Sequence, residues 1–310
     1  MKEWNYAFSV PEQKKVRVLV HTDCKNEADD QYALAHHVMT PKFILKGVIA
    51  SHFNMHPREY GDGHTAQASF NEVNKVLEYM GIDDIPVVKG AEHPLKNETE
   101  PQISEGAQMI IDEAMRDDQH PLFIACQGSL TDLASAILME PAICDRMTAI
   151  WIGGGDYPEG GSEFNLEQDI AAANILMKSK MDVWQVTKSV YKQMAVSLAE
   201  LQCNVMPCGK IGRYLFEQML HVNNECADIP WPNGEIWGLG DSPTVSLLLE
   251  EEQRTDSYDL VKAPVIDYET MKYCYREDAK LIRVYKKVDA RLTLQDFYAK
   301  LKLNYGETEN

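Results

Sequence analysis

The chain has 310 residues, 45% of them hydrophobic, and 48 acidic against 30 basic side chains give it a formal net charge of −18. This length and apolar content suffice for a large buried core. No linker rich in Pro, Gly or Ser divides the chain, so we expect one domain over residues 1–310. Because the sequence is acidic and has no basic cluster, nucleic acid and anionic membrane surfaces are poor partners for it.

The seven cysteines are odd in number and form no Cys-x-x-Cys pair. Several lie in apolar strand or helix patterns, which suits reduced thiols, so we expect a cytoplasmic location. The amino-terminal stretch MKEWNYAFSVPEQKK lacks the apolar core of a signal peptide, and no apolar run approaches the length of a membrane span.

Strand and helix patterns alternate along the chain. Apolar and β-branched residues over 16–20 predict a strand buried on both faces, and apolar residues at helical spacing from Gln31 predict the helix that follows. Further strands are predicted over residues 43–50, 85–88, 122–126, 148–152, 183–186 and 281–288. Further helices are predicted over residues 65–80, 104–115, 131–139, 171–177, 197–221, 241–249 and 294–301. Repeated βα units of this kind predict an α/β fold with a mostly parallel central sheet and helices on both faces.

Four carboxylates follow the first predicted strand within eight residues: Asp23, Glu27, Asp29 and Asp30. Open α/β sheets bind their ligands at this carboxyl end of the strands. Crowded like charges raise one another's pKa unless a positive charge lies among them, and a divalent cation would supply it. The structural alternative is that Asp29 and Asp30 only complement the helix dipole, but the number of acids favours a metal. Asp241, taken alone, is typical of an N-cap before a proline.

Several segments together resemble the nucleoside hydrolase family of the inosine- and uridine-preferring type. In chain order they are TDCKNEADDQYALA, GVIASHFN, NEVNKVLEYMGIDDIPVVKGAEHPL, ACQGSLTDLASAILMEP with AIWIGGG, SEFNLEQDIAAA, and GDSPTVSLLLE. They extend over nearly the whole chain, and their order and spacing make the resemblance specific. The resemblance implies a nucleoside-hydrolase-like, open, Rossmann-like fold. It also implies calcium-dependent hydrolysis of the N-glycosidic bond of ribonucleosides, or of a related N-riboside, to free base and ribose.

The resemblance also assigns roles to the acids. It implies that Asp23, Asp30 and Asp241 bind Ca²⁺ together with the backbone carbonyl of Gln127. Oxygen ligands with room for water and sugar hydroxyls suit Ca²⁺ better than Mg²⁺ or zinc. Asp29 corresponds to the general base, which takes a proton from a metal-bound water as that water attacks the anomeric carbon.

Three further residues match the ribose-binding positions of the family: Asn54, Glu163 and Asn165. Amide and carboxylate groups can hold sugar hydroxyls through paired donors and acceptors. An acidic pocket would also stabilise the positive charge that develops on the sugar ring as the base leaves. Without the family pattern, Asn54 would be interpreted as a turn residue and Glu163 as a solvated loop acid.

The sequence departs from the family pattern in three places. Five residues separate Asp23 from Asp29 where the family has three, and this insertion could bring Asn26 or Glu27 to the ion or the substrate. His21 stands where the family commonly has an aspartate. Gly240 stands where many members have a histidine that is thought to protonate the departing base.

The base pocket is not specified by the sequence. The candidates for lining it are His52, His56, His93, Glu105, Trp231 and Trp237. Tryptophans beside prolines are more often packing residues than stacking surfaces for a base.

Two other functions compete with hydrolysis of nucleosides. A metal-dependent phosphohydrolase with an aspartyl nucleophile would need an aspartate at position 21, so the presence of His21 disfavours this function. A non-catalytic, calcium-dependent nucleoside or sugar binder of the same fold is opposed by Asp29 and favoured by Gly240. The resemblance also implies a homo-oligomer, either a dimer or a tetramer.

Overall fold

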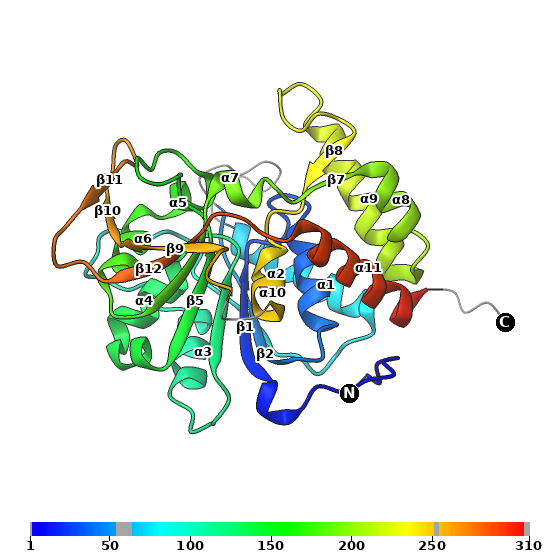
Figure 1. Ribbon diagram of the computed structural model, residues 1–310, viewed down its shortest axis with the longest axis horizontal. Coiled ribbons are helices and arrows are strands. Elements are labelled where there is room, and N and C mark those ends of the chain that lie inside the picture. The colour runs from blue at the N-terminus through cyan, green and yellow to red at the C-terminus, as the bar shows by residue number, and fades with distance from the viewer. Residues whose placement is uncertain (1, 54–63, 251–253, 307–310) are drawn as a thin grey trace.

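Eight strands form the central sheet in the order β3-β2-β1-β4-β5-β6-β12-β9 (Figure 1). Neighbouring strands are parallel, except that β9 runs antiparallel to β12. The strands of this sheet are β1 Val16–Thr22, β2 Phe43–Ala50, β3 Val87–Lys89, β4 Leu122–Cys126, β5 Met147–Ile152, β6 Asp182–Val186, β9 Tyr258–Lys262 and β12 Leu281–Tyr285. The computed structural model describes residues 2–53, 64–250 and 254–306. It confirms the mostly parallel α/β fold that the sequence predicts.

Helices cover both faces of the sheet and bury two apolar clusters against it. One cluster contains side chains of α1 Asp30–Val38, α2 Thr65–Met80, α8 Leu198–Asn204, α9 Gly209–Glu225, α10 Pro243–Leu249 and α11 Ala290–Tyr305. The other contains side chains of α3 Glu105–Ala114, α4 Thr131–Met139, α5 Phe164–Gln168 and α6 Ile170–Lys178. Strand β1 contributes Val18 and Val20 to the first cluster and Leu19 to the second. Since successive strand residues point to opposite faces, the apolar run of β1 is explained by burial on both sides.

The predicted helix over residues 197–221 is wrong as one element. Strand β7 (Ala195–Ser197) comes first, α8 ends at Asn204, and α9 begins at Gly209. Pro207 lies in the break, where its missing N–H and its ring would disrupt a continuous helix. Gly209 has a φ of 64°, a left-handed conformation that glycine adopts without steric cost.

Several short elements were not predicted from the sequence. Besides α5, they include α7 Lys188–Tyr191, strand β8 Ile236–Gly238, which pairs with β7, and the hairpin strands β10 Pro264–Ile266 and β11 Tyr273–Tyr275. Segments of three to five residues are too short to show a hydrophobic period. Among the described residues, no helix combines the length and apolarity needed to cross a membrane.

The order of strands reverses between β1 and β4. The chain builds β2 and β3 on one side of β1 and then returns to place β4 on its other side. The loops after β1 and β4 therefore diverge and leave a crevice at the carboxyl ends of the strands, where doubly wound sheets bind ligands. Asp23 directly follows β1 and Gln127 directly follows β4.

A buried polar pair lies behind this crevice. His21 Nε2 of β1 is 2.9 Å from Asp132 Oδ2 of α4, and both side chains are inaccessible to solvent. Asp132 Oδ1 also accepts hydrogen bonds from the Ala91 N–H at 2.9 Å and the Ser104 hydroxyl at 2.5 Å. Burial raises the pKa of Asp132, but the partners His21, Ser104 and Ala91 outweigh it, so the pKa lies below its ordinary value. His21 therefore anchors α4 to the sheet.

Replacing His21 with alanine should lower the free energy of unfolding by about 3 kcal/mol, because Asp132 would keep a buried charge without its ring partner. Urea unfolding at neutral pH measures the change. His221→Ala is the control, since the side chain of His221 is 57% exposed, and it should cost less than about 0.5 kcal/mol. A loss for His21→Ala as small as that of the control would contradict the prediction.

Candidate active site

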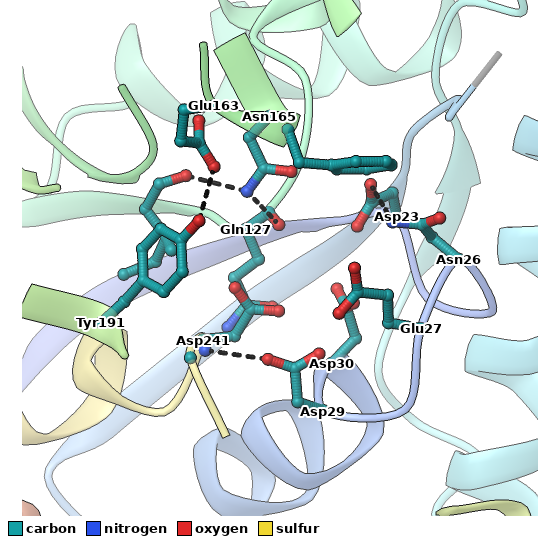
Figure 2. A pocket seen from close by; sticks show the side chains of 13 residues that line it. Asp23, Asn26, Glu27, Asp29, Asp30, Gln127, Glu163, Asn165, Tyr191 and Asp241 are labelled. Atoms are coloured by element: carbon teal, nitrogen blue, oxygen red, sulfur yellow. Dashed lines mark hydrogen bonds between the residues drawn. The ribbon is translucent and has the colours of Figure 1, made fainter. Parts of the chain in front are cut away.

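A small pocket of about 60 Å³ opens at the carboxyl edge of the sheet. Figure 2 shows its side chains converging from the loop after β1, the start of α1, the loop before α10 and the start of α5. The lining residues are Asp23, Asn26, Glu27, Asp29, Asp30, Gln127, Ile152, Glu163, Phe164, Asn165, Tyr191, Gly240 and Asp241. None of them is a lysine, arginine or histidine, so this part of the described chain has no cationic side chain to balance its acids.

Asp29 occupies the N-cap position of α1 without capping the helix. Its side chain accepts no hydrogen bond from the first turn of α1. Instead, Oδ2 accepts the backbone N–H of Asp241 at 3.3 Å, from a segment more than two hundred residues away in the sequence. Asp29 therefore does not cap α1 through a side-chain hydrogen bond, and its carboxylate is held toward the pocket.

Asp241 is likewise not the cap of its helix, because Ser242 holds the N-cap position of α10. Its backbone carbonyl accepts the Thr244 hydroxyl at 2.7 Å. That hydroxyl has one hydrogen, so the side chains of Gln127 and His37, at 2.8 and 3.0 Å, must donate to it. This network fixes the turn that presents the Asp241 carboxylate to the pocket.

Three of the acids meet closely enough to share an ion. Carboxylate oxygens of Asp29, Asp30 and Asp241 lie within 4.8 Å of one another, and all three residues are buried. Asp23, which is 1% exposed, lines the same pocket but is not part of this triplet. Its Oδ2 is 3.5 Å from Asn26 Nδ2.

Burial and mutual repulsion perturb these acids strongly. Burial raises the pKa of Asp29 to about 6, although backbone N–H groups that include those of Asp241 and Gly240 oppose the rise. Burial, with the charge of Asp29, raises the pKa of Asp30 to about 7. Burial and the charge of Asp30 also raise the pKa values of Asp23 and Asp241 well above the ordinary value of an aspartate. The site therefore favours either bound protons or a bound cation.

The donor set suits a hard divalent cation. Every charged group in the triplet is a carboxylate, and oxygen-only sites select Mg²⁺, Ca²⁺ or Mn²⁺ over metals that prefer nitrogen or sulfur. The Thr22 hydroxyl donates to Asp30 Oδ1 and holds one ligand in place. The described residues can thus hold a metal ion at this position.

Glu163 and Asn165 form the opposite wall of the pocket. Asn165 Nδ2 donates to the carbonyls of Gln127 at 3.1 Å and Ile152 at 2.9 Å, which leaves its Oδ1 as an acceptor. Glu163 Oε2 accepts the backbone N–H of Gly154, in the loop after β5, at 2.7 Å and that of Leu166, at the start of α5, at 3.0 Å. Its Oε1 accepts the Tyr191 hydroxyl at 3.0 Å. Burial raises the pKa of Glu163. Both side chains therefore have fixed orientations and spare acceptors for hydroxyl groups.

The ring of Tyr191 occupies the space next to Gly240. A Cβ atom added to Gly240 would lie 3.1 Å from Tyr191 Cδ2 and 3.5 Å from Asp29 Oδ2. A histidine at position 240 would therefore press against the Tyr191 ring. Sequence reasoning missed Tyr191, because a tyrosine in a one-turn helix shows no pattern that points to a site.

The inserted loop contributes to the pocket. Asn26 and Glu27, the two residues that the sequence suggested as additional contacts, both line it. Lys25 has a φ of 90°, so the loop adopts a left-handed turn at a residue other than glycine. Gly128 lies on the other side, where a Cβ atom would be 2.8 Å from Asp23 Cγ. Glycine at this position allows Asp23 to pack against the loop after β4.

The structure places the candidates for the base pocket in different environments. His52 is buried with Nε2 2.8 Å from the Thr131 hydroxyl, and His93 and Glu105 are exposed; none of the three lines the pocket. Trp237 is buried, and its ring lies 5.1 Å from that of Trp231. Asn54 and His56 lie outside the described residues.

Of these candidates, Trp231 lines a second cavity of about 280 Å³ that shares residues with the acidic pocket. Its lining residues are Glu27, Asp29, Phe164, Lys188, Tyr191, Lys192, Trp231, Gly238 and Gly240. Sequence reasoning did not single out Phe164, Lys188 or Lys192.

The fold and the buried acids define an α/β protein with a candidate metal centre at the carboxyl edge of its sheet. A sequence model of the family described as inosine-uridine preferring nucleoside hydrolase matches residues 18–295, so the chain belongs to this family.

Curated relatives match parts of the chain. The inosine-uridine preferring nucleoside hydrolase of Crithidia fasciculata is 28% identical over 141 residues, which cover 36% of this chain and 43% of that protein. The pyrimidine-specific ribonucleoside hydrolase RihA of Enterobacter sp. (strain 638) is 22% identical over 206 residues, 58% of this chain and 63% of the relative. The matched regions thus span less than two thirds of these relatives.

Solved structures share the fold over nearly their full length. The purine-preferring ribonucleoside hydrolase from Gardnerella vaginalis aligns with a TM-score of 0.73 and 16% identity, covering 93% of this chain and 99% of that one. The plant nucleoside hydrolase PpNRh1 aligns with a TM-score of 0.69 and 17% identity, covering 92% and 98%. These similarities establish the fold.

The acidic triplet predicts a pH-dependent effect of divalent ions on stability. Without a cation, the raised pKa values of Asp29 and Asp30, about 6 and 7, mean that the folded state holds protons that the unfolded state has released. The stability gained from these bound protons is complete below the pKa of an aspartate in the unfolded chain. It is lost as the pH rises through the folded pKa values of about 6 and 7. We expect the difference in melting temperature between samples in CaCl₂ and in EDTA to widen from about pH 5 to about pH 8. Calorimetry measures it, and a difference independent of pH would contradict the expectation.

Proposed function

We propose that the protein hydrolyses the N-glycosidic bond of ribonucleosides, or of a related N-riboside, in a calcium-dependent reaction that yields free base and ribose. The observation that carries the proposal is the position of Asp29. Its carboxylate is aimed by the Asp241 N–H into a pocket that also holds Asp30, Asp241 and the wall formed by Glu163 and Asn165. Membership in the nucleoside hydrolase family supports this reaction.

In the proposed site, Asp30, Asp241, Asp23 and the Gln127 carbonyl hold the ion. When bound, Ca²⁺ would supply the positive charge that the acids lack and would lower the pKa of a water molecule. The carboxylate triplet supports Asp30 and Asp241 as ligands, and the shared pocket supports Asp23 and Gln127.

Asp29 acts as the general base. It takes a proton from water while the oxygen of that water attacks the anomeric carbon. A pKa raised by burial toward neutrality suits a base that must accept a proton at physiological pH. The bond from the anomeric carbon to the base nitrogen breaks with its electron pair going to the nitrogen, and the surrounding carboxylates stabilise the positive charge on the sugar ring.

Glu163 and Asn165 hold the ribose hydroxyls. The two N–H bonds of Asn165 are used by backbone carbonyls, so its Oδ1 faces a hydroxyl donor. Glu163 keeps an acceptor on Oε1 beside the Tyr191 hydroxyl. Asn54, which the family pattern also assigns to the ribose, remains part of the proposal.

One alternative is supported by a specific observation. The acidic pocket and the adjoining cavity contain no histidine among their described residues, and Gly240 has no side chain to donate a proton. A non-catalytic, calcium-dependent nucleoside or sugar binder would have such a site. The phosphohydrolase alternative is less favoured, because the His21 side chain points to Asp132. A cytoplasmic location and a homo-oligomeric state stay predictions.

Asp29→Asn should lower kcat by about 10²- to 10⁴-fold, the usual contribution of a general base. Calcium affinity should change little, since the proposed ligands remain. Ribose release from inosine, uridine and nicotinamide riboside, with calorimetric calcium titration, separates the two effects. Asp267→Asn, at an exposed position, is the control. Wild-type protein that binds these ribosides without cleaving them would establish the binder.

Asp30→Ala should lose calcium binding and the thermal stabilisation that calcium confers, because Asp30 contacts Thr22 and lies in the triplet. Calcium titration and melting curves measure both. Unchanged affinity would remove Asp30 from the proposed ligands.

Tyr191→Phe should lower kcat/KM about tenfold, equivalent to ~1.4 kcal/mol, because Glu163 loses the donor that orients it. Steady-state kinetics measures the change. Tyr305→Phe is the control, since it removes a hydroxyl that donates to the Met80 carbonyl elsewhere. An effect no larger than that of the control would show that Tyr191 does not orient Glu163.

A further inference from the structure

The cavity beside the acidic pocket has a different chemical character. The two share Glu27, Asp29, Phe164, Tyr191 and Gly240, so a molecule held at the acids extends directly into the larger space. With about 280 Å³, this cavity is close to the lower end of the volumes of small-molecule sites. It has room for a ring attached to a ribose in the acidic pocket.

Two lysines give this cavity its only positive side chains among the described residues. Lys188 and Lys192 lie four residues apart, at the start and just after the end of α7, and both line the cavity. Lys188 Nζ donates to the Ser162 carbonyl at 3.1 Å, a neutral partner. No carboxylate of the described residues lies within ion-pair distance of either lysine, in a chain with a net charge of −18. The charge of Lys188 also acts on Asp156, whose pKa it lowers, and Glu27 and Asp29 line the other part of the cavity. Two lysines without a direct ion pair beside a ligand space favour an anionic group at their end of the cavity.

Aromatic surfaces complete the cavity. Trp231 is 43% exposed and packs against the buried Trp237 at 5.1 Å between ring centroids. Phe164 lines both spaces. Exposed aromatic faces of this kind stack on planar rings.

Resting on the proposed function, we propose that this cavity binds the leaving base and selects N-ribosides whose base carries a carboxylate. The ring stacks on Trp231, and the carboxylate points to Lys188 and Lys192, away from the repelling charge of Asp29. Ribosides of nicotinate fit this description.

The reaction balances without an acid from the protein. In a pyridinium riboside, the bond from the anomeric carbon to nitrogen breaks, and its electron pair neutralises the ring nitrogen. The water oxygen bonds to the anomeric carbon, and the water proton passes to Asp29 and then to solvent. Nicotinate leaves as an anion, which the two lysines stabilise. The absence of a side chain at Gly240 is compatible with this leaving group.

The test compares nicotinate riboside with nicotinamide riboside, which differ only in the group expected to face the lysines. We expect wild-type protein with calcium to have a kcat/KM at least about tenfold higher for nicotinate riboside at low salt, and the ratio to fall as NaCl screens the charges. Lys188→Met/Lys192→Met should bring the ratio to about one. The control, Lys210→Met/Lys302→Met, removes two lysines of α9 and α11 that do not line the cavity and should keep the wild-type ratio.

A wild-type ratio of one, or a ratio unchanged in the Lys188/Lys192 variant, would overturn the inference while cleavage of nicotinamide riboside sustains the proposed function. If neither riboside is cleaved while inosine or uridine is, the inference is overturned and the proposed function stands. If none of these four compounds is cleaved, the proposed function fails. Calorimetry with free nicotinate and free nicotinamide then tests the subsite by itself, and equal affinities for the two would overturn the inference. The protein could instead prefer uridine 5′-monophosphate over uridine, lose this preference in the Lys188/Lys192 variant, and show no preference for nicotinate riboside. This result would mean that the lysines bind a phosphate, and it would also overturn the inference.

Discussion

Repulsion among buried carboxylates is the constraint on which the site depends. Asp29, Asp30 and Asp241 approach within 4.8 Å, and the pocket around them contains no cationic side chain among the described residues. Neutral donors, which include Thr22 and the backbone of Asp241, position them without cancelling their charge. Such an arrangement is unfavourable for an empty, fully ionised protein, so its geometry is best explained by a ligand that brings positive charge.

The strand order explains how residues distant in sequence reach one point. Reversal between β1 and β4 opens the crevice, and each neighbouring loop then supplies one kind of group. The loop after β1 supplies acids, the loop after β4 supplies Gln127, and the start of α5 supplies Glu163 and Asn165. Thr244 joins the last acid to this frame, because its hydroxyl binds the Asp241 carbonyl while the Gln127 and His37 side chains donate to it. The packing of α1 against α10 therefore helps to fix the position of the Asp241 carboxylate in the pocket.

The fold could be predicted from the sequence because its long elements have clear periods. The apolar run of β1 indicates burial on both faces, and the structure shows the alternation of Val18, Leu19 and Val20 between two clusters. The helix predicted over residues 197–221 failed because Pro207 and Gly209 break it, which hydrophobic spacing alone does not reveal. The hairpin strands carry too few residues to show a period.

The site could be predicted only in part. Asp29, Asp30 and Asp241 were recognisable from clustered charge and family pattern, and they do meet. Tyr191 was not recognisable, since its role depends on the space beside a glycine in another segment. Lys188 and Lys192 were equally hidden, because a pair of surface-type residues becomes informative only when the cavity beside them is known.

The Tyr191 ring lies so close to the place where a Cβ atom of residue 240 would be that the two positions form one steric unit. With 3.1 Å available to a Cβ atom, a bulky residue at position 240 requires a smaller or displaced residue at position 191. Relatives that carry a side chain at the first position should therefore have lost the aromatic ring at the second, and the two should covary across the family. Exchange of one without the other would leave either a clash or a void beside Asp29.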